Sequence, residues 1–336
     1  MVLPSPPRRA VPQPHRFHAG SSTRSASAIT PSVGESGSPA GLMTAPPRDP
    51  HAPAGQSRAA ILRHDPTRQP HLLDLPLWPH GRAALFELIA DHLAAPASTD
   101  GALLELHSVN AEISIQVRSD ERYRELLARN PFNLPDGEWV KRLCNLKHGR
   151  KLERISGSDM VGELCALARD HGHGVFLLGA SEQVSAEASR RLVASLPGLD
   201  LGRYAPPFEE RPDVSPRVSR EALARIAEAR PAILLAFLGS PKQELWFRQH
   251  SDELTASGVR LVLGAGAGLD FLAGRVRRAP RFVSQLGFEW LWRLAHQPRA
   301  RFRRALARLP RFLVLALVDA LHGRASGTAS QTPHLP

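Results

Sequence analysis

Cysteine and long apolar runs are both scarce in this sequence. Its 336 residues include two cysteines, Cys144 and Cys165, which lie in apolar patterns typical of helices. A small disulfide-stabilised domain is thereby excluded, and we expect two buried free thiols, as in a protein of the reducing cytosol. No run reaches the eighteen or so apolar residues that a membrane-spanning helix needs, so the sequence predicts no transmembrane segment.

Patterns that hold metal ions are missing as well. His107, His148, His171 and His173 have no spacing to cysteines or carboxylates that is typical of a metal site. The sequence also contains no Asp-x-Asp pair, a usual means of holding a divalent ion against a nucleotide diphosphate. We expect no metal site, and no pattern points to a resident cofactor.

Apolar residues are few from Met1 to about Gln69, where proline, serine, arginine, histidine and glycine prevail. Such a composition cannot bury enough surface to offset the entropy of ordering the chain. We therefore expect residues 1–69 to form a disordered tail. Roughly 250 residues of globular sequence remain, which allows one large domain or two small ones.

Acidic residues are too few to balance the basic ones, since 43 lysines and arginines against 32 aspartates and glutamates give a formal net charge of +11. Much of the excess lies in the first seventy residues and between Arg275 and Arg311. A basic tail and one basic terminal helix suit an anionic membrane surface at least as well as nucleic acid. A non-catalytic nucleic-acid-binding protein stays open as an alternative.

Strand-like and helix-like patterns alternate through the globular part, which predicts an α/β fold, a Rossmann-like parallel sheet with helices on both faces. Ser158 and Ser219 are expected to cap two of the helices. The expected strands cover residues 71–78, 102–108, 132–134, 174–180, 198–205, 233–239 and 259–266, and the expected helices cover residues 82–95, 111–130, 159–172, 181–196, 219–230 and 241–258.

The stretch GAGAGLD, residues 264–270, follows an expected strand and superficially resembles a dinucleotide-binding fingerprint. A true fingerprint needs a later strand that ends in an acidic residue to bind the ribose. Here a basic, tryptophan-rich segment follows instead, which argues against a nicotinamide or flavin enzyme. The glycines indicate a close backbone approach, either to a ligand or to a neighbouring helix.

Three polar positions near expected strand ends each allow two interpretations. In GSPKQE, residues 239–244, the free amides at the start of a helix, together with Lys242 and Gln243, suit an anion or a nucleotide edge. The alternative is that Lys242 and Glu244 are surface charges and that Gln243 is only a cap. Asp136, in LPDG, is either a turn residue or a catalytic base. Arg154, in LERISG, is either part of a surface ion pair or a phosphate ligand.

The C-terminal segment after Phe288 combines tryptophans, many arginines and the ten-residue apolar run Phe312–Leu321. It is too short to span a bilayer, but it could lie in the membrane interface with its arginines at the headgroups. The alternative is a helix packed on the domain with a solvated basic face. We expect a basic helical appendage over residues 291–323, after the α/β domain over residues 70–290 and before a disordered tail over residues 324–336.

Taken in order, these motifs resemble the WecG/TagA/CpsF glycosyltransferase family of bacterial surface polysaccharide assembly. The resemblance covers about Leu72 to Arg304, nearly the whole globular part. It is carried by the sequences SVNAE, LPDG, ERISGSD, FLLGASEQV, FLGSPKQE, GAGAGLDFLAG, RRAP and FEWLWRL.

The resemblance implies a hexosyltransferase similar to an N-acetylmannosaminyltransferase. It implies an inverting, metal-independent transfer of a sugar from a nucleotide diphosphate, usually UDP, to a sugar carried on undecaprenyl diphosphate. The implied product is a lipid-linked unit of an exopolysaccharide or cell-wall polymer. The implied location is peripheral, on the cytoplasmic face of the plasma membrane. The resemblance implies no nucleic-acid partner and leaves open whether the protein forms a homo-oligomer.

The resemblance also assigns roles to residues. Asp136 takes the place of the general base, and Arg154 of the residue that stabilises the diphosphate. Arg293 and Arg303 match arginines of a C-terminal appendage that contacts the lipid carrier or the leaving group. The full set of expected substrate-binding residues is Ser108, Asn110, Gly179, Lys242, Gln243, Gly266, Asp270, Arg293 and Arg303.

The sequence departs from the family pattern in two places. The common terminal signature Glu-Pro-x-Arg-x-x-Arg here has Gln297 at its start and Ala300 in an arginine position. In addition, Glu138 and Trp139 replace the more usual small residues after the Asp-Gly pair. A membrane-associated scaffold that keeps the fold without activity therefore stays open as a further alternative.

Overall fold

The structure is a computed structural model that describes residues 65–95, 103–209, 213–289, 291–292 and 298–329. These residues belong to one compact unit. The expected tail over residues 1–69 falls almost wholly outside them. After a short 3-10 helix, η1 (Pro66–Arg68), a two-residue strand pair forms a hairpin, β1 (His71–Leu72) with β2 (Leu75–Pro76).

Six parallel strands form the main sheet in the order β4-β3-β8-β7-β5-β6. Every pairing between neighbours in this sheet is parallel, which confirms the predicted α/β class. The strands are β3 (Leu104–Val109), β4 (Asn133–Pro135), β5 (Val175–Gly179), β6 (Leu201–Tyr204), β7 (Ile233–Phe237) and β8 (Leu261–Gly264).

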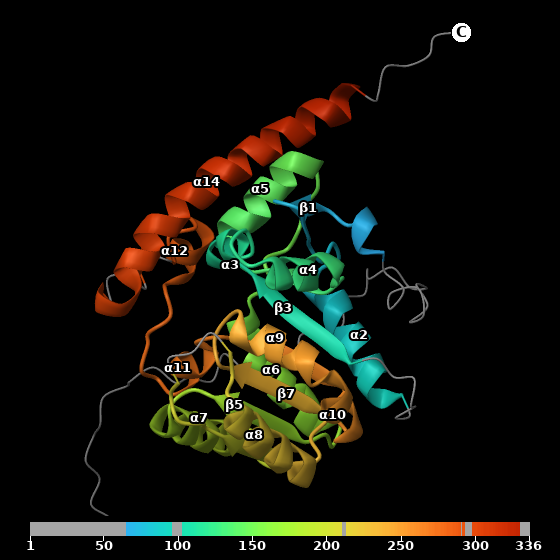
Figure 1. Cartoon of the computed structure of the whole chain (residues 1–336), viewed down its shortest axis with the longest axis vertical. Helices are drawn as coiled ribbons and strands as arrows, with labels where there is room; N and C mark the ends of the chain where they lie inside the picture. The colour runs from blue at the N-terminus through green and yellow to red at the C-terminus, as the bar shows by residue number, and fades with distance from the viewer. Residues whose placement is uncertain (1–64, 96–102, 210–212, 290, 293–297, 330–336) are drawn as a thin grey trace, which may run out of the picture. The chain divides into compact units, whose positions relative to one another are not determined.

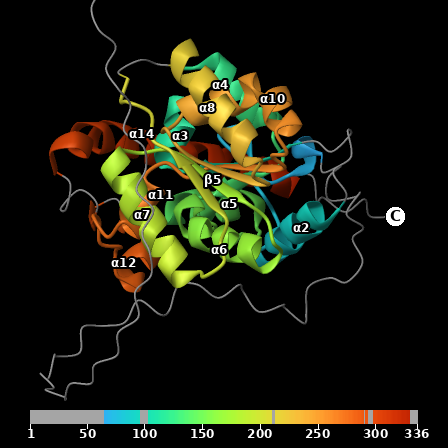
Figure 2. The same cartoon turned by 90° about the horizontal axis from the view of Figure 1, so that it is seen from below.

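Helices cover both faces of this sheet, as Figure 2 shows. On one face, α2 (Arg82–Ala94), α6 (Gly157–Asp170) and α7 (Glu182–Ser195) pack against alternate strand residues such as Leu177 and Leu235. On the other face, α8 (Pro216–Ala229), α9 (Lys242–Gln249) and α10 (Ser251–Ala256) cover the intervening strand residues. Both faces are apolar because the strands are buried on both sides.

A third apolar cluster lies beside the β3 and β4 edge of the sheet. It joins the hairpin to α3 (Ala111–Gln116), α4 (Glu121–Arg129), α5 (Glu138–His148) and the long helix α14 (Pro298–Ala329). Phe312 and Ala316 of α14 are fully buried in this cluster. In Figure 1, α14 passes along α5 and α3.

The C-terminal helix is also fixed by an ion pair. Asp319 accepts hydrogen bonds from Lys147 Nζ at 2.8 and 2.9 Å and from the amide of Leu73 at 2.9 Å. The Lys147 side chain is only 7% exposed. One face of α14, from Phe312 to Ala320, therefore packs on the domain. The helix continues to Ala329, beyond the end expected at residue 323.

Several expected boundaries were wrong for identifiable reasons. The predicted strand 71–78 is a hairpin, because Leu73 and Asp74 adopt left-handed backbone conformations (φ 51° and 65°) that turn the chain. The predicted helix 111–130 is two helices, since Asp120 caps α4 through the amide of Tyr123. The predicted helix 241–258 is likewise divided, between α9 and α10, at His250.

Both predicted serine caps were wrong as well. The helix expected to start after Ser158 begins at Gly157, with Ser156 at the N-cap position, and the Ser158 hydroxyl lies 3.1 Å from that of Ser156. The helix expected to start at Ser219 begins at Pro216, and Ser215 caps it. In each case the first turn lies earlier in the chain than the apolar pattern indicates.

The two cysteines are free and buried, as the sequence predicts. Burial raises the pKa of both the Cys144 and Cys165 thiols to about 12. Among the described helices, none is both long and apolar enough to cross a membrane.

Candidate functional site

A cavity of about 420 Å³ lies where four neighbouring strands end. Asn110 follows β3, Asp136 follows β4, Gly239 lies just beyond β7, and Gly266 just beyond β8. All four residues line the cavity. Because parallel strands end at one edge of the sheet, and ligands of open α/β sheets bind at that edge, this cavity is the candidate active site.

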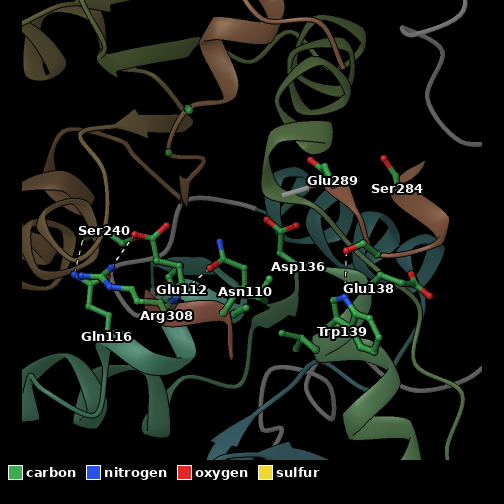
Figure 3. Close-up of a pocket in the computed structure, with 18 of the residues that line it drawn as sticks. Asn110, Glu112, Gln116, Asp136, Glu138, Trp139, Ser240, Ser284, Glu289 and Arg308 are labelled. Carbon is green, nitrogen blue, oxygen red and sulfur yellow. Dashed lines mark hydrogen bonds and ion pairs between the residues drawn. The ribbon is translucent and has the colours of Figure 1, made fainter. Parts of the chain in front are cut away.

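Asn110 and Asp136 occupy equivalent places on adjacent strands. They directly follow Val109 and Pro135, which are register partners in the sheet, and the amide of Asp136 donates to the carbonyl of Val109 at 3.0 Å. The Asn110 side chain accepts a hydrogen bond from the amide of Ile113 at 3.0 Å and so caps α3. Figure 3 shows both side chains at the cavity.

The Gly239–Ser240 segment of the cavity lining rests on a buried polar network. Gln243 and Glu244 are each 1% exposed. Gln243 Oε1 accepts from the amide of Gly239 at 3.2 Å, and Glu244 Oε1 accepts from Ser240 Oγ at 2.8 Å and from Gln243 Nε2 at 2.8 Å. Gln243, expected to bind substrate, therefore lies behind the cavity and positions the residues that line it.

The same network explains one glycine of the GAGAGLD stretch. A Cβ atom on Gly264 would lie 2.4 Å from the side-chain nitrogen of Gln243, so this glycine allows α9 to approach the end of β8. Gly266 has a φ of 52° and lines the cavity directly. Gly264 therefore confirms the expected close approach to a helix, and the approach of Gly266 to a ligand stays a prediction. Downstream, the chain forms the short helix α11 (Gly268–Leu272).

Arg154 lies behind the cavity rather than in its lining. Its guanidinium is 3.5 Å from the carboxylate of Glu289, which lines the cavity, and 3.4 Å from that of Asp159. The Arg154 side chain is about one quarter exposed, at 26%. Arg154 is therefore separated from the lining by its ion pair with Glu289.

Trp139 and the segment that contains α12 (Arg281–Gln285) form a side of the cavity that the sequence did not indicate. The indole nitrogen of Trp139 donates to the carbonyl of Gly287 at 3.1 Å. Arg142 lies over the Trp139 ring at 5.5 Å and donates to the carbonyl of Gln285 at 2.6 Å. The unusual tryptophan after the Asp-Gly pair thus attaches this segment to α5.

Helix α14 supplies the remaining side of the cavity through Arg308 and Leu309. Arg308 Nη1 is 2.7 Å from Glu112 Oε1, and Figure 3 shows this pair beside Ser240 and Gln116. Arg308 lies beyond Arg303, the last residue to which the family resemblance assigns a role, so the sequence did not indicate Arg308 as a site residue.

Carboxylates are prominent in the lining, where Glu112, Asp136, Glu138 and Glu289 all occur. Three of them pair with basic side chains: Glu112 with Arg308, Glu289 with Arg154, and Glu138 with Lys141 and Arg142 at 2.8 and 3.0 Å. Within the described ranges, no group of three or more histidine, cysteine or acidic residues is arranged to hold a metal ion.

The other expected site residues lie elsewhere. Ser108 is buried in β3 at 8% exposure, and Gly179 ends β5, two strands away from β8. Lys242 Nζ donates to the carbonyl of Glu209 at 2.8 Å, and Asp270 lies in α11; neither is in the cavity lining. Arg293 and the side chain of Arg303 lie outside the described part of the chain.

Comparisons with known proteins identify the family of the chain. Residues 70–326 match the family model described as "Glycosyl transferase WecG/TagA/CpsF family". The chain is 30% identical over 225 residues to the N-acetylglucosaminyldiphosphoundecaprenol N-acetyl-beta-D-mannosaminyltransferase of Bacillus spizizenii. That alignment covers 67% of this chain and 82% of the relative. The protein is therefore a glycosyltransferase and belongs to the WecG/TagA/CpsF family.

Proposed function

We propose that the protein transfers N-acetylmannosamine or a related hexose from a UDP-sugar to N-acetylglucosamine carried on undecaprenyl diphosphate, with inversion and without a metal ion. The observation that carries the proposal is the meeting of Asp136, Asn110, Ser240 and Gly266 at one cavity in this family's fold. The acceptor follows from the name of the Bacillus relative. The product would enter an exopolysaccharide or a cell-wall polymer.

Asp136 is the proposed general base. Its carboxylate takes the proton from the acceptor hydroxyl as that oxygen attacks the anomeric carbon of the donor from the face opposite the diphosphate. The new C–O bond forms while the bond from the anomeric carbon to the phosphate oxygen breaks, which inverts the anomeric centre. Asn110 and Asp136 follow the register partners Val109 and Pro135 and both line the cavity, which supports a role for Asn110 in orienting the acceptor.

The departing diphosphate gains negative charge, which must be met by cationic or hydrogen-bonding groups. Arg154 is the proposed residue for this task, because guanidinium groups bind phosphate oxygens through two parallel hydrogen bonds. It becomes available when the diphosphate displaces Glu289, whose contact with Arg154 measures 3.5 Å. Arg293 and Arg303 remain predicted contributors.

The test is a transfer assay with the purified full chain. Short-chain prenyl-diphosphate N-acetylglucosamine is incubated with a panel of UDP-sugars in EDTA, and products are read by mass spectrometry. We expect one sugar to be transferred in EDTA at the rate found with added magnesium. Transfer that needs a divalent ion would contradict the metal-independent mechanism, and no transfer from any donor would favour the non-catalytic scaffold.

We propose further that the protein is peripheral on the cytoplasmic membrane face, where the lipid-linked acceptor lies. Two neighbouring parts of the chain, residues 282–291 and α14, carry eight of the large apolar side chains that are exposed in the described structure. Arg311 is exposed among them. Apolar side chains with nearby cations suit an anionic lipid interface. The eight are Phe282, Leu286, Phe288, Leu291, Val314, Leu317, Val318 and Leu321.

Sedimentation with vesicles that contain anionic phospholipid tests this surface. We expect the Val314→Glu/Val318→Glu double variant to lose most of the binding of the wild type, because both side chains are exposed on α14, at 63% and 46%. Val193→Glu is the control, since Val193 is exposed to the same degree, 46%, on α7. Unchanged binding of the double variant would contradict the assignment, and a lost oligomer with intact vesicle binding would assign the face to a second copy.

A further inference from the structure

Arg308 brings a positive charge into the lining of the cavity. Of the described residues that line it, Arg308 is the one with a positively charged side chain, while four carry carboxylates. A ligand with several negative charges, such as a diphosphate, enters such a cavity only if cations offset the acidic groups. Arg308 is the described side chain best placed to do so without leaving the lining.

The partner of Arg308 is held weakly enough to be exchanged. The pair with Glu112 is short, 2.7 Å, but its two side chains are 34% and 52% exposed. Ion pairs this open to solvent contribute little to stability, whereas a guanidinium and a phosphate form two charge-assisted hydrogen bonds. A phosphate that reaches Arg308 therefore displaces Glu112.

The backbones behind both side chains are fixed. Arg308 lies about one helical turn before Phe312, which is fully buried, and so the base of its side chain moves little. Glu112 lies in the first turn of α3, which Asn110 caps. The exchange thus requires only that two side chains rotate, in a cavity already lined by Ser240 and Gly266.

We propose that Arg308 binds a phosphate of a substrate diphosphate, and that Glu112 is the internal anion that occupies Arg308 until substrate arrives. This inference rests on the proposed function, in which both the nucleotide donor and the lipid-linked acceptor carry a diphosphate. Arg308 binds substrate directly, and Glu112 acts through it by competing for the guanidinium.

The test compares wild type with four changes in the full-length protein: Arg308→Ala, Arg308→Lys, Glu112→Gln and the Arg308→Ala/Glu112→Gln double variant. Arg220→Ala is the matched control, because it removes the same charge from an exposed position on another helix, α8, outside the lining. Calorimetry measures the Kd of UDP and of inorganic pyrophosphate, and kinetics measure the KM of prenyl-diphosphate N-acetylglucosamine. Thermal melting checks that each variant is folded.

We expect Arg308→Ala to weaken diphosphate binding by about tenfold or more, with Arg308→Lys in between because lysine lacks the planar pair of donors. Glu112→Gln should tighten binding about threefold, since it removes the competing charge. That gain should vanish in the double variant. A structural role for the pair would instead make Glu112→Gln and Arg308→Ala act in the same direction.

The three ligands separate the sources of the diphosphate. Weaker UDP binding assigns Arg308 to the donor, and a higher KM for the lipid-linked acceptor with unchanged UDP binding assigns it to the acceptor. If both quantities match those of Arg220→Ala, or if the wild type binds none of the three ligands, the inference is overturned. A wild type that binds pyrophosphate through Arg308 but transfers no sugar would refute the proposed function alone.

Discussion

Replacing Asp136 by asparagine is expected to lower turnover by about a hundredfold or more, because the amide cannot accept the proton of the acceptor hydroxyl. Asparagine has nearly the shape of aspartate, and the backbone bond from residue 136 to Val109 is independent of the side chain. The fold and the affinity for UDP should therefore change little. Single-turnover kinetics with saturating acceptor and donor measure the effect on the chemical step.

The control for Asp136→Asn is Asp252→Asn, which makes the same change at an exposed position in the first turn of α10. This variant should keep the wild-type rate. The two interpretations of Asp136 give different results, since a residue needed only for the turn before α5 would lower stability and leave the rate per folded molecule nearly unchanged. A rate within a few-fold of wild type would contradict the general-base assignment and leave Asp136 as a turn residue.

Replacing Asp319 by alanine is expected to destabilise the domain by about 3 kcal/mol, since it leaves the buried Lys147 ammonium without its carboxylate. The change also removes the acceptor of the Leu73 amide at the hairpin turn. For a domain of this size the melting temperature should fall by roughly 6–10 °C. Denaturant unfolding gives the free energy, and thermal melting gives the temperature.

Two further variants distinguish the cause of this destabilisation. Lys147→Met combined with Asp319→Leu should recover much of the loss, because apolar residues can replace a buried ion pair. Glu221→Ala breaks the exposed pair with Arg225 on α8 and should change the melting temperature little. A small effect of Asp319→Ala, equal to that of Glu221→Ala, would mean that α14 does not depend on the ion pair.

Periodicity predicted the sheet and most of the helices that cover it, because each strand of a parallel sheet is buried on both faces and stands out as a continuous apolar run. VFLLG of β5 and ILLAF of β7 are fully buried examples. Periodicity did not predict α5. Helix boundaries were less predictable, since the side chains that break or cap a helix act locally. Asp120 and Ser215, for instance, carry no signal in the apolar period.

The candidate site was predictable where a residue follows a strand directly, as Asn110 and Asp136 do, or lies just beyond one, as Gly266 does. Residues that approach from elsewhere in the chain, such as Trp139 and Arg308, depend on how helices pack, and that packing is not encoded in any short motif. Gln243 is a third case. Its motif pointed to the candidate site, but only the structure shows that Gln243 is buried, at 1% exposure, and supports the residues that line the cavity.

The contact between Leu73 and Asp319 joins residues that are 246 positions apart in the chain. During synthesis on the ribosome, the apolar surface of the hairpin and of α3 to α5 therefore stays uncovered until Phe312 and Ala316 have been made. Arg308 comes into place with the same helix, so the cavity is complete only after α14 has been made. A prematurely released chain would lack both this covering and the arginine, and it would be a substrate for cellular proteases rather than a slower enzyme.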